Sequence, residues 1–374
     1  MSKLFCAALL VCVITGPTAG IVADESEPRI PVIYSTDLHH PHIDPDDHFD
    51  LATAFALPEL DLRAIVLDCG AHQQVAPGVI PLRQMLHLAQ RDVPFAIGLS
   101  APLQSPSDLG REQGAEFQGG VELILKTLRE SEVPVTVFTT GSLRDVAAAL
   151  NRDPELLRQK VSRLYINIGN PATGQNAVQD EYNVGLDRQA YLRIMNSDLP
   201  IYWCPCFDGQ LWQRGKTGTY WKFVQEQVLE SAPAALQNFF IFALTKPPGV
   251  DPIAALTTPQ DTAARQTVWK MPRNMWCTGP LLHAAGRQIV ASGPDRWSAI
   301  SKQSTVREVN LEVIEAFEFV PISARATQLA GGEIQVVSSS AAESSRMRVF
   351  QTRDDRYDQI MTSCLRELFA DFSR

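Results

Sequence analysis

The chain has 374 residues, of which 45% are hydrophobic and 20% are charged, and its formal net charge at pH 7 is −9. This length accommodates one large α/β domain or two domains, and the composition is that of a globular protein with a full core. The acidic balance argues against a protein that binds nucleic acid through its phosphates, because such binding needs clustered lysine and arginine.

The first 24 residues have the pattern of a secretory signal. Lys3 precedes an apolar run over residues 4–14, and small residues at 18–23 permit cleavage. The run is too short to span a bilayer, and no later segment is long and apolar enough to do so. We therefore predict a secreted or periplasmic protein with no membrane association after the signal is removed.

The cysteines do not indicate a disulfide framework. Five of the seven lie beyond residue 24, and both the odd number and the irregular spacing argue against a set of paired bridges. We expect most of them to be buried free thiols. They are Cys69, Cys204, Cys206, Cys277 and Cys364.

Predicted strands and helices alternate along the chain. Strands are predicted over residues 33–37, 63–68, 94–98, 135–140, 164–168 and 200–204, and helices over residues 46–57, 81–90, 121–129, 142–150, 187–195 and 353–372. A helical pattern also covers residues 220–244, whereas period-two runs at 315–320 and 333–337 indicate antiparallel strands lateral to the main sheet. The fold class is therefore α/β, a mostly parallel open sheet with helices on both faces.

The first candidate site lies where the strand ending at Asp37 meets the helix that begins at Asp46 and Asp47. Ligands of open α/β sheets bind in the crevice at the carboxyl ends of the strands. Hard cations such as calcium are bound by carboxylate oxygens of this kind. Taken alone, an Asp-Pro-Asp-Asp sequence is more often a capped turn, but the strand–loop–helix context directs these aspartates towards one point.

This stretch resembles the amino end of the nucleoside hydrolase family, of the inosine/uridine-preferring type. That family carries Asp-x-Asp-Pro-Gly-x-Asp-Asp-Ala after its first strand, and an ungapped count back from Pro58 gives Asp47 the place of the last aspartate, Asp46 the one before it and Asp37 the first. The loop here is five residues longer and lacks the motif glycine, and Asp44 competes with Asp46 for its role. The loop also contains His39, His40 and His42.

Two later segments resemble the same family. Residues 139–145 are similar to its Thr-Gly-Pro-Leu-Thr-Asn segment, which implies that the backbone carbonyl of Thr140 binds calcium; Ser142 and Asp145 also fit a helix capping box. Residues 181–187 are similar to Glu-Phe-Asn followed by apolar residues. This implies that Glu181 and Asn183 lie on one side of an extended piece and contact the sugar. Gln175 or Asn176 takes the place of an upstream asparagine.

A fourth segment and two departures complete the resemblance. Asp251 and Pro252 fit a helix N-cap followed by proline at N1, and they also resemble the family's His-Asp-Pro, in which the aspartate is the last calcium ligand and holds the ribose. Val250 stands where the family has the histidine. Ala71 stands where the family has a sugar-binding asparagine, with His72, Gln73 or Gln74 as candidate substitutes.

The resemblance implies one nucleoside hydrolase-like domain over residues 25–374 that hydrolyses the N-glycosidic bond of ribonucleosides with Ca²⁺, giving free base and ribose. Two alternatives stay open: a related N-glycosidase of different substrate, and a non-catalytic nucleoside- or sugar-binding protein. The expected partner is a small-molecule nucleoside or related N-glycoside, and a homo-oligomer is compatible with the family. The implied roles are calcium ligation by Asp37, Asp47, Thr140 and Asp251, catalysis by Asp37 as general base with His39, His40 and His42 as candidate acids, and sugar binding by Asp46, Asn176, Glu181, Asn183 and Asp251.

Overall fold

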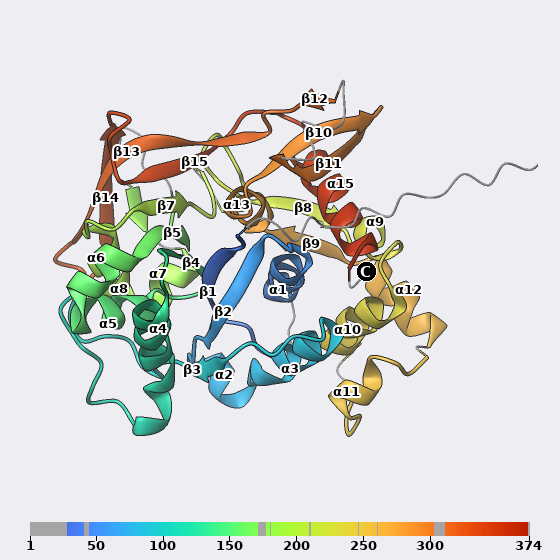
Figure 1. Cartoon of the computed structure of the whole chain (residues 1–374), viewed down its shortest axis with the longest axis horizontal. Coiled ribbons are helices and arrows are strands. Elements are labelled where there is room, and N and C mark those ends of the chain that lie inside the picture. Colours follow the sequence, from blue (N-terminus) through green and yellow to red (C-terminus); the bar gives the residue numbers. More distant parts are fainter. Residues whose placement is uncertain are drawn as a thin grey trace, which may run out of the picture.

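The computed structural model describes residues 28–40, 45–170, 177–179, 181–208, 211–245, 247–259, 261–302 and 311–372. Within these residues a ten-stranded sheet forms the centre of the molecule (Figure 1). In spatial order its strands are β3 (Phe95–Ile97), β2 (Leu60–Leu67), β1 (Ile30–Thr36), β4 (Val135–Thr139), β5 (Val161–Asn167), β7 (Ile201–Cys204), β15 (Arg348–Thr352), β13 (Phe317–Gln328), β14 (Ile334–Ser340) and β6 (Ala177–Gln179).

The sheet changes from parallel to antiparallel pairing at β15. Every neighbouring pair from β3 to β15 is parallel, and the pairs beyond β15 are antiparallel. The predicted α/β class and the predicted antiparallel strands near the C-terminus are therefore confirmed. Two smaller sheets lie beside the main one, and they consist of β8 (Trp221–Val224) with β9 (Pro272–Met275), and of β10 (Arg287–Gly293), β11 (Arg296–Ser301) and β12 (Glu312–Val313).

Helices cover both faces of the main sheet (Figure 1). One face packs against α1 (Asp46–Ala56), α3 (Val79–Leu88), α10 (Ala234–Thr245), α13 (Thr278–Ala284) and α15 (Tyr357–Ala370). The other packs against α4 (Gly119–Glu130), α5 (Arg144–Arg152) and α8 (Arg188–Met195). The shorter helices are α2 (Ala71–Val75), η1 (Ala115–Phe117), α6 (Pro154–Lys160), α7 (Tyr182–Leu186), α9 (Glu226–Leu229), α11 (Pro252–Ala255) and α12 (Thr262–Trp269).

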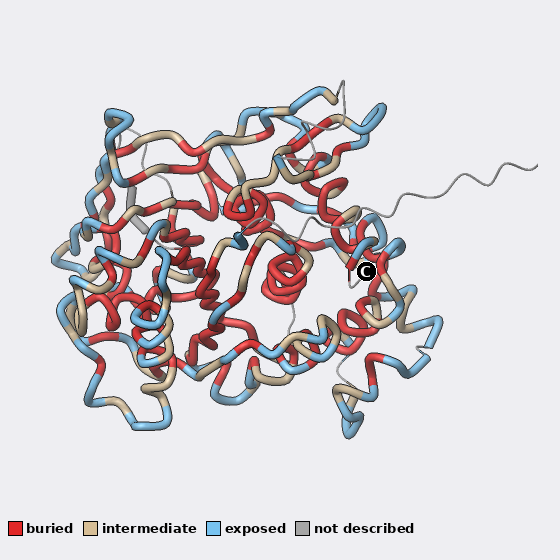
Figure 2. Tube along the Cα trace, in the orientation of Figure 1, coloured by how far each residue is buried: buried red, intermediate tan, exposed pale blue. Residues whose placement is uncertain are grey.

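The alternation of side chains along β1 explains why there are two cores. Tyr34 belongs to the core under α1, whereas its neighbour Ile33 belongs to the core under α4 and α5. Successive side chains of a strand point to opposite faces, so a strand covered on both sides reads as one continuous apolar run. Helix α1 is enclosed by the other elements and is buried along almost its whole length, as Figure 2 shows.

The helix predicted over residues 220–244 is wrong at its amino end. Residues 221–224 form β8, in which Trp221 and Phe223 are buried while Lys222 and Val224 are exposed. This period of two is typical of a strand with one covered face. The helical part of the prediction corresponds to α9 and α10.

The remaining expectations on whole elements concern membranes and cysteines. None of the helices in the described part of the chain is long and apolar enough to cross a membrane. All five described cysteines are free and buried, as predicted from their spacing.

Candidate active site

Parallel pairing brings the ends of three neighbouring strands to one level. The amide of Asp68, just after β2, donates to the carbonyl of Thr36 at the end of β1 over 2.9 Å. The amide of Thr140, just after β4, donates to the carbonyl of Ser35 over 2.9 Å. Asp37, Asp68 and Thr140 therefore share one edge of the sheet, which is the edge where α/β folds bind ligands.

Asp37 and Asp47 form a buried carboxyl pair at this edge. Their relative exposures are 8% and 6%. Oδ1 of Asp47 accepts hydrogen bonds from the hydroxyl of Thr36 over 3.0 Å and from the hydroxyl of Thr140 over 2.7 Å. The two carboxyl groups are close enough for the charge of Asp47 to act on Asp37. Segments far apart in the sequence thus converge on one acidic pair.

Burial is the main cause of the raised pKa values of Asp37 and Asp47. It raises the pKa of Asp37 well above its usual value, and the negative charges of Asp47 and Asp68 raise it further. Burial also raises the pKa of Asp47, although hydrogen bonds from Thr140 and Thr36 oppose that shift. Two carboxyl groups this close cannot both be ionised cheaply without a positive partner.

Gly141 allows the turn after β4 to approach Asp37. A Cβ atom on Gly141 would lie 2.7 Å from the Cβ of Asp37 and 3.0 Å from its backbone nitrogen. Any side chain at this position would therefore push the end of β4 away from the end of β1. The Thr-Gly pair in the sequence thus has a packing reason in addition to its turn chemistry.

Asn183 lies at the same edge. Its side-chain amide donates to the carbonyl of Thr140 over 3.1 Å and to the carbonyl of Asn167 over 3.2 Å. This carbonyl of Thr140 is the one that the family resemblance assigned to the metal. The amide of Asn183 is consequently within reach of anything that binds there.

Glu181 is near the site, but its carboxylate accepts hydrogen bonds from backbone amides. The expectation of an extended segment is wrong, because residues 182–186 form α7 and Glu181 is its N-cap. The carboxylate accepts from the amides of Gly169, Asn183 and Val184 over 2.8, 2.9 and 3.2 Å. Tyr182, which is largely exposed, lies close enough to the acidic pair for the pKa of its phenol to be raised, first by partial burial and then by Asp37.

The loop histidines differ in their surroundings. The ring of His39 stacks on that of His72 with a centroid separation of 5.7 Å, and the charge of His39 is among the influences that lower the pKa of Asp47 against the effect of burial. The ring of His40 instead stacks on Phe242 over 4.9 Å. His42 lies outside the described residues, as do Asp44, Gln175 and Asn176.

The candidate substitutes for the missing asparagine have separate contacts. The amide of Gln73 donates to the backbone carbonyl of Asp37, and Gln73 is buried. Gln74 donates to the carbonyl of Ser100 over 3.3 Å. Two of the three candidates therefore contact residues of the proposed site. Gln73 contacts Asp37, and His72 stacks on His39.

Asp251 is placed apart from the acidic pair. It is the exposed N-cap of α11, with Pro252 at N1 as predicted, and its Oδ1 accepts from the amide of Ala254 over 2.7 Å. Helix α11 packs on α3 and α10. Among the described residues, no hydrogen bond or ion pair joins Asp251 to Asp37, Asp47 or Thr140.

The start of α13 carries a residue that the sequence reasoning missed. Cys277 precedes α13, and its buried thiol lies close enough to Asp50 on α1 for the two groups to influence each other's pKa. Burial raises the pKa of this thiol, and the charges of Asp50, Asp47 and Asp46 add to that effect. Cys277 follows a short strand, and no local pattern links it to residues more than 200 positions earlier in the sequence.

The predicted capping box at residues 142–145 is also wrong. The amide of Ser142 donates to Asp68 over 2.8 Å, and the carboxylate of Asp145 accepts from the amide of Leu99 over 3.0 Å. Helix α5 therefore begins without a side-chain cap of its own. Its first residues instead bind neighbouring segments of the chain.

The donor set of the acidic edge suits a hard cation. It consists of oxygens from two buried carboxyl groups and one strand-end carbonyl, which are ligands that calcium prefers. Within the described ranges, no group of three or more His, Cys, Asp or Glu side chains is arranged to hold a metal ion. The edge therefore provides a partial oxygen shell, with Asp46 half-buried beside Asp47 at the start of α1.

Known proteins are similar to this chain in sequence and in fold. The chain is 31% identical over 188 residues to pyrimidine-specific ribonucleoside hydrolase RihA of Escherichia coli O1:K1, covering 46% of this chain and 58% of that protein. It is 32% identical over 188 residues to RihA of Salmonella paratyphi B, with the same coverage. The matched part thus spans less than two thirds of the length of these relatives.

The fold is shared with a solved plant protein. The structure of the plant nucleoside hydrolase PpNRh1 aligns with a TM-score of 0.50 and 16% sequence identity, covering 92% of this chain and 100% of that chain. The model of the family described as inosine-uridine preferring nucleoside hydrolase matches residues 32–316, which include Asp37, Asp47, Thr140 and Asn183. The chain therefore belongs to the inosine-uridine preferring nucleoside hydrolase family.

Proposed function

We propose that this protein hydrolyses the N-glycosidic bond of ribonucleosides, releasing the free base and ribose, and that it does so with bound Ca²⁺. The observation that carries the proposal is the pair of buried carboxyl groups of Asp37 and Asp47 at the carboxyl edge of the sheet in a member of this family, where the charge of Asp47 raises the pKa of Asp37. Such a pair is costly without a cation, and it lies where the fold binds ligands.

Three groups would hold the cation: the carboxylates of Asp37 and Asp47 and the backbone carbonyl of Thr140. When bound, a divalent cation at this edge supplies a water molecule of lowered pKa and a positive charge beside the sugar hydroxyls. Burial raises the pKa of both Asp37 and Asp47. Calcium binding would displace protons from these carboxyl groups, so affinity for calcium should rise with pH.

The residues of this chain then divide the remaining work. Asp37, once ionised, accepts the proton of the attacking water. The hydroxyls of Thr36 and Thr140 fix the orientation of Asp47. The side-chain nitrogen of Asn183 is held by the carbonyls of Thr140 and Asn167, so Asn183 presents its amide oxygen to the sugar. Asp46 presents a carboxylate, and both groups accept from hydroxyl groups. The bond breaks through an oxocarbenium-like sugar, which neighbouring carboxylates stabilise.

The direct test uses the mature protein, calcium and a nucleoside panel. The related RihA proteins are named as pyrimidine-specific ribonucleoside hydrolases, so uridine and cytidine come first, followed by inosine. We expect equal release of base and reducing sugar, loss of activity on chelation, and loss of both activity and calcium binding in Asp37→Asn. Absence of free base with every nucleoside in the presence of calcium would contradict the proposed activity.

Asp251 is a separable part of this proposal. The resemblance makes it a fourth calcium ligand, whereas the structure places it on the exposed start of α11. Calorimetric titration of Asp251→Asn with calcium separates the two roles. A large loss of affinity assigns Asp251 to the metal, and unchanged affinity leaves it as the cap of α11 only.

A second candidate function is nucleoside or sugar binding without turnover. The specific observation in its favour is that the carboxylate of Glu181 already accepts three backbone hydrogen bonds and so has little capacity left for a substrate hydroxyl. Under this alternative, isothermal titration would show saturable binding of a nucleoside in calcium while no base is released over many hours.

We also propose that the protein is exported. The supporting feature is the signal-like pattern of residues 1–24. Mass spectrometry of the exported fraction from the native host should find a chain that starts between residues 20 and 25. Recovery of the intact amino terminus from that fraction would contradict export with cleavage.

A further inference from the structure

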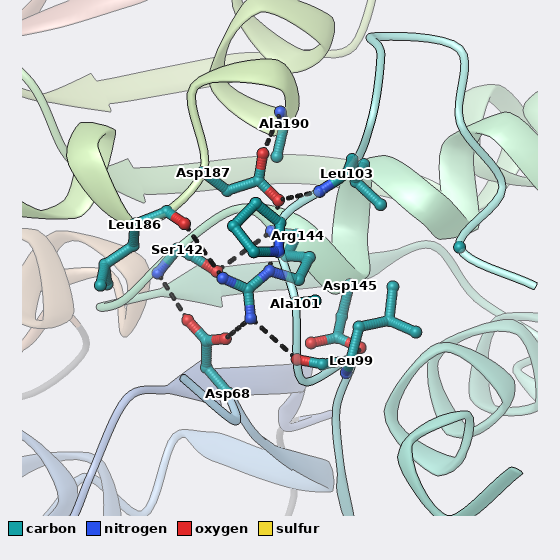
Figure 3. A network of polar contacts seen from close by, with 12 residues as sticks. Asp68, Leu99, Ala101, Leu103, Ser142, Arg144, Asp145, Leu186, Asp187 and Ala190 are labelled. Atoms are coloured by element: carbon teal, nitrogen blue, oxygen red, sulfur yellow. Dashed lines mark hydrogen bonds and ion pairs between the residues drawn. The ribbon is translucent and has the colours of Figure 1, made fainter. Parts of the chain in front are cut away.

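Arg144 stands out among the buried groups beside the site because the proposed chemistry does not use it. Its side chain is only 2% exposed. Its guanidinium donates to the carbonyls of Leu99 and Leu186 over 2.8 and 3.1 Å. It also forms ion pairs with Asp68 and Asp187, at 3.5 and 3.2 Å. Figure 3 shows these four contacts converging on the one side chain.

The first of these contacts leads directly to the acidic edge. One oxygen of Asp68 pairs with Arg144, and the other accepts from the amide of Ser142 over 2.8 Å. Ser142 follows Gly141, which packs against Asp37, and Thr140, whose hydroxyl binds Asp47. The position of Asp68 therefore fixes the turn that carries one proposed metal-binding group, the Thr140 carbonyl, and that contacts the other two, Asp37 and Asp47.

The second and third contacts hold the other segments that surround the edge. The Leu186 carbonyl ends α7, the short helix that carries Asn183. Asp187 caps α8 by accepting from Ala190 over 2.9 Å, and its other oxygen accepts from the amide of Leu103 over 2.8 Å. Arg144 thus connects the end of β2, the junction of α7 and α8 and the long loop after β3 (Figure 3).

The geometry requires an arginine. A guanidinium presents five donors in a planar fork, so it can bind two carboxylates and two carbonyls at once, whereas an ammonium is a compact charge with a different geometry. Asp68, Asp145 and Asp187 surround Arg144 and are all buried.

We propose that Arg144 is a positioning residue for the active site: it acts through Asp68 and Ser142 on the Thr140–Asp37 edge, and through Leu186 and Asp187 on the segment that carries Asn183. The catalytic part of this inference rests on the proposed nucleoside hydrolysis. The structural part does not, because it concerns only how three segments are held together.

The test compares Arg144→Lys with wild type by hydrogen exchange of single amides, in the absence of metal and substrate. We expect exchange of the Ser142 and Leu103 amides to become at least about tenfold faster, because each donates to a carboxylate that pairs with Arg144. Calcium affinity and kcat should each fall by about 10- to 100-fold, the usual effect of losing a group that orients metal ligands. KM should change less than kcat, since Arg144 does not touch the substrate.

The matched control is Arg287→Lys. Arg287 also pairs with a carboxylate, that of Glu59 at 3.0 Å, and also donates to a backbone carbonyl. Glu59 precedes β2, whereas Asp68 follows it, so the control pair lies at the opposite end of the same strand. The melting temperature of Arg287→Lys should fall by about as much as that of Arg144→Lys. Hydrogen exchange at Ser142 and calcium affinity should stay unchanged in Arg287→Lys.

The outcomes decide between positioning and bulk stability. If Arg144→Lys increases exchange evenly, including in the β10–β11 hairpin, or leaves Ser142, Leu103 and calcium affinity unchanged, Arg144 is only a stability residue and the proposal is wrong. If the wild-type protein releases no base, the proposed hydrolysis is wrong. The hydrogen-exchange result would still decide whether Arg144 holds the three segments in position. Should Arg144→Lys not fold, Asp68→Asn provides the same comparison at Ser142.

Discussion

The hydroxyl of Thr140 donates a 2.7 Å hydrogen bond to the carboxylate of Asp47, across 93 positions of sequence. It joins the end of β4 to the first turn of α1, and both residues are buried. Because the same residue offers its backbone carbonyl to the proposed cation, one threonine both orients a ligand and supplies another.

Removal of this hydroxyl should weaken calcium binding. Thr140→Val keeps the shape of the side chain and the backbone carbonyl but leaves Asp47 with the hydroxyl of Thr36 as its remaining hydroxyl donor. We expect calcium affinity to fall by about 10- to 100-fold and the free energy of unfolding to fall by about 1–3 kcal/mol, as for a lost hydrogen bond to a charged group. Calorimetric titration and urea unfolding measure the two effects.

Thr140→Ser is the matched control for that variant. It retains the donor and loses only a methyl group, so its calcium affinity should stay close to that of wild type. Equal losses of affinity in the valine and serine variants would show that packing around the methyl group, and not the hydrogen bond to Asp47, holds the edge together.

A second prediction concerns the close approach of Gly141 to Asp37. In Gly141→Ala the new methyl group would meet the Cβ of Asp37 at 2.7 Å, so the end of β4 or of β1 must shift. We expect a destabilisation of about 1–3 kcal/mol, typical of overpacking, with a parallel loss of calcium affinity. Gly185→Ala is the control, because a Cβ there has nothing within 4 Å; a similar loss in both variants would contradict the steric argument.

The convergence at this edge could be predicted from sequence for a physical reason. Apolar runs identify the buried strands, and the residue after each strand of a parallel sheet must lie at the same edge as the residue after its neighbour. Asp37 can be placed in this way, and Asp46 and Asp47 follow because the next helix begins there. The assignment of Thr140 to the same site comes instead from the resemblance to the family.

The remaining features depend on tertiary contacts that no local pattern encodes. Glu181 becomes a helix cap partly because the amide of Gly169, from another loop, reaches its carboxylate. An aspartate followed by proline indicates a helix N-terminus, but it does not indicate whether that terminus faces the site. Here Asp251 caps the exposed start of α11. The thiol of Cys277 meets Asp50 through the packing of α13 on α1. Sequence reasoning therefore found the strand ends and missed the contacts between distant segments.

A third prediction uses the buried carboxyl group of Asp145. Burial and the nearby charge of Asp68 raise its pKa to about 7, against opposing effects of the Leu99 amide, Arg144 and Arg152. The native state therefore holds this proton more tightly than the unfolded state does. The contribution of Asp145 to the free energy of unfolding is therefore most favourable at low pH. It is lost as the pH rises from about 4, the usual carboxyl pKa, to about 7, the pKa in the folded protein.

Asp145→Asn should remove this pH dependence. The amide oxygen of asparagine can still accept from Leu99, whereas no charge develops on the side chain. Urea unfolding at pH 5, 6, 7 and 8 should show wild type losing free energy of unfolding relative to the variant over this range, with the difference levelling off above pH 8. An unchanged difference between the two proteins from pH 5 to 8 would show that Asp145 is already ionised in the folded protein at pH 5.

The last prediction concerns the proton that the departing base needs. The resemblance puts Val250 in the place of the family's histidine, and Val250 is exposed together with the start of α11. His39, by contrast, stacks on His72 beside the acidic pair and influences the charge of Asp47. An imidazole there can donate a proton near neutral pH. His39→Ala should therefore lower kcat on natural nucleosides by about 10²-fold or more, the scale of a lost general acid, while calcium affinity barely changes. The loss should be much smaller for a synthetic riboside whose leaving group needs no proton.

The matched controls are His40→Ala and His87→Ala, which should retain most of the activity. The ring of His40 stacks on Phe242, and His87 lies on the exposed side of α3. If His39→Ala loses activity equally on both substrates, its ring orders the loop, and the proton comes from another group.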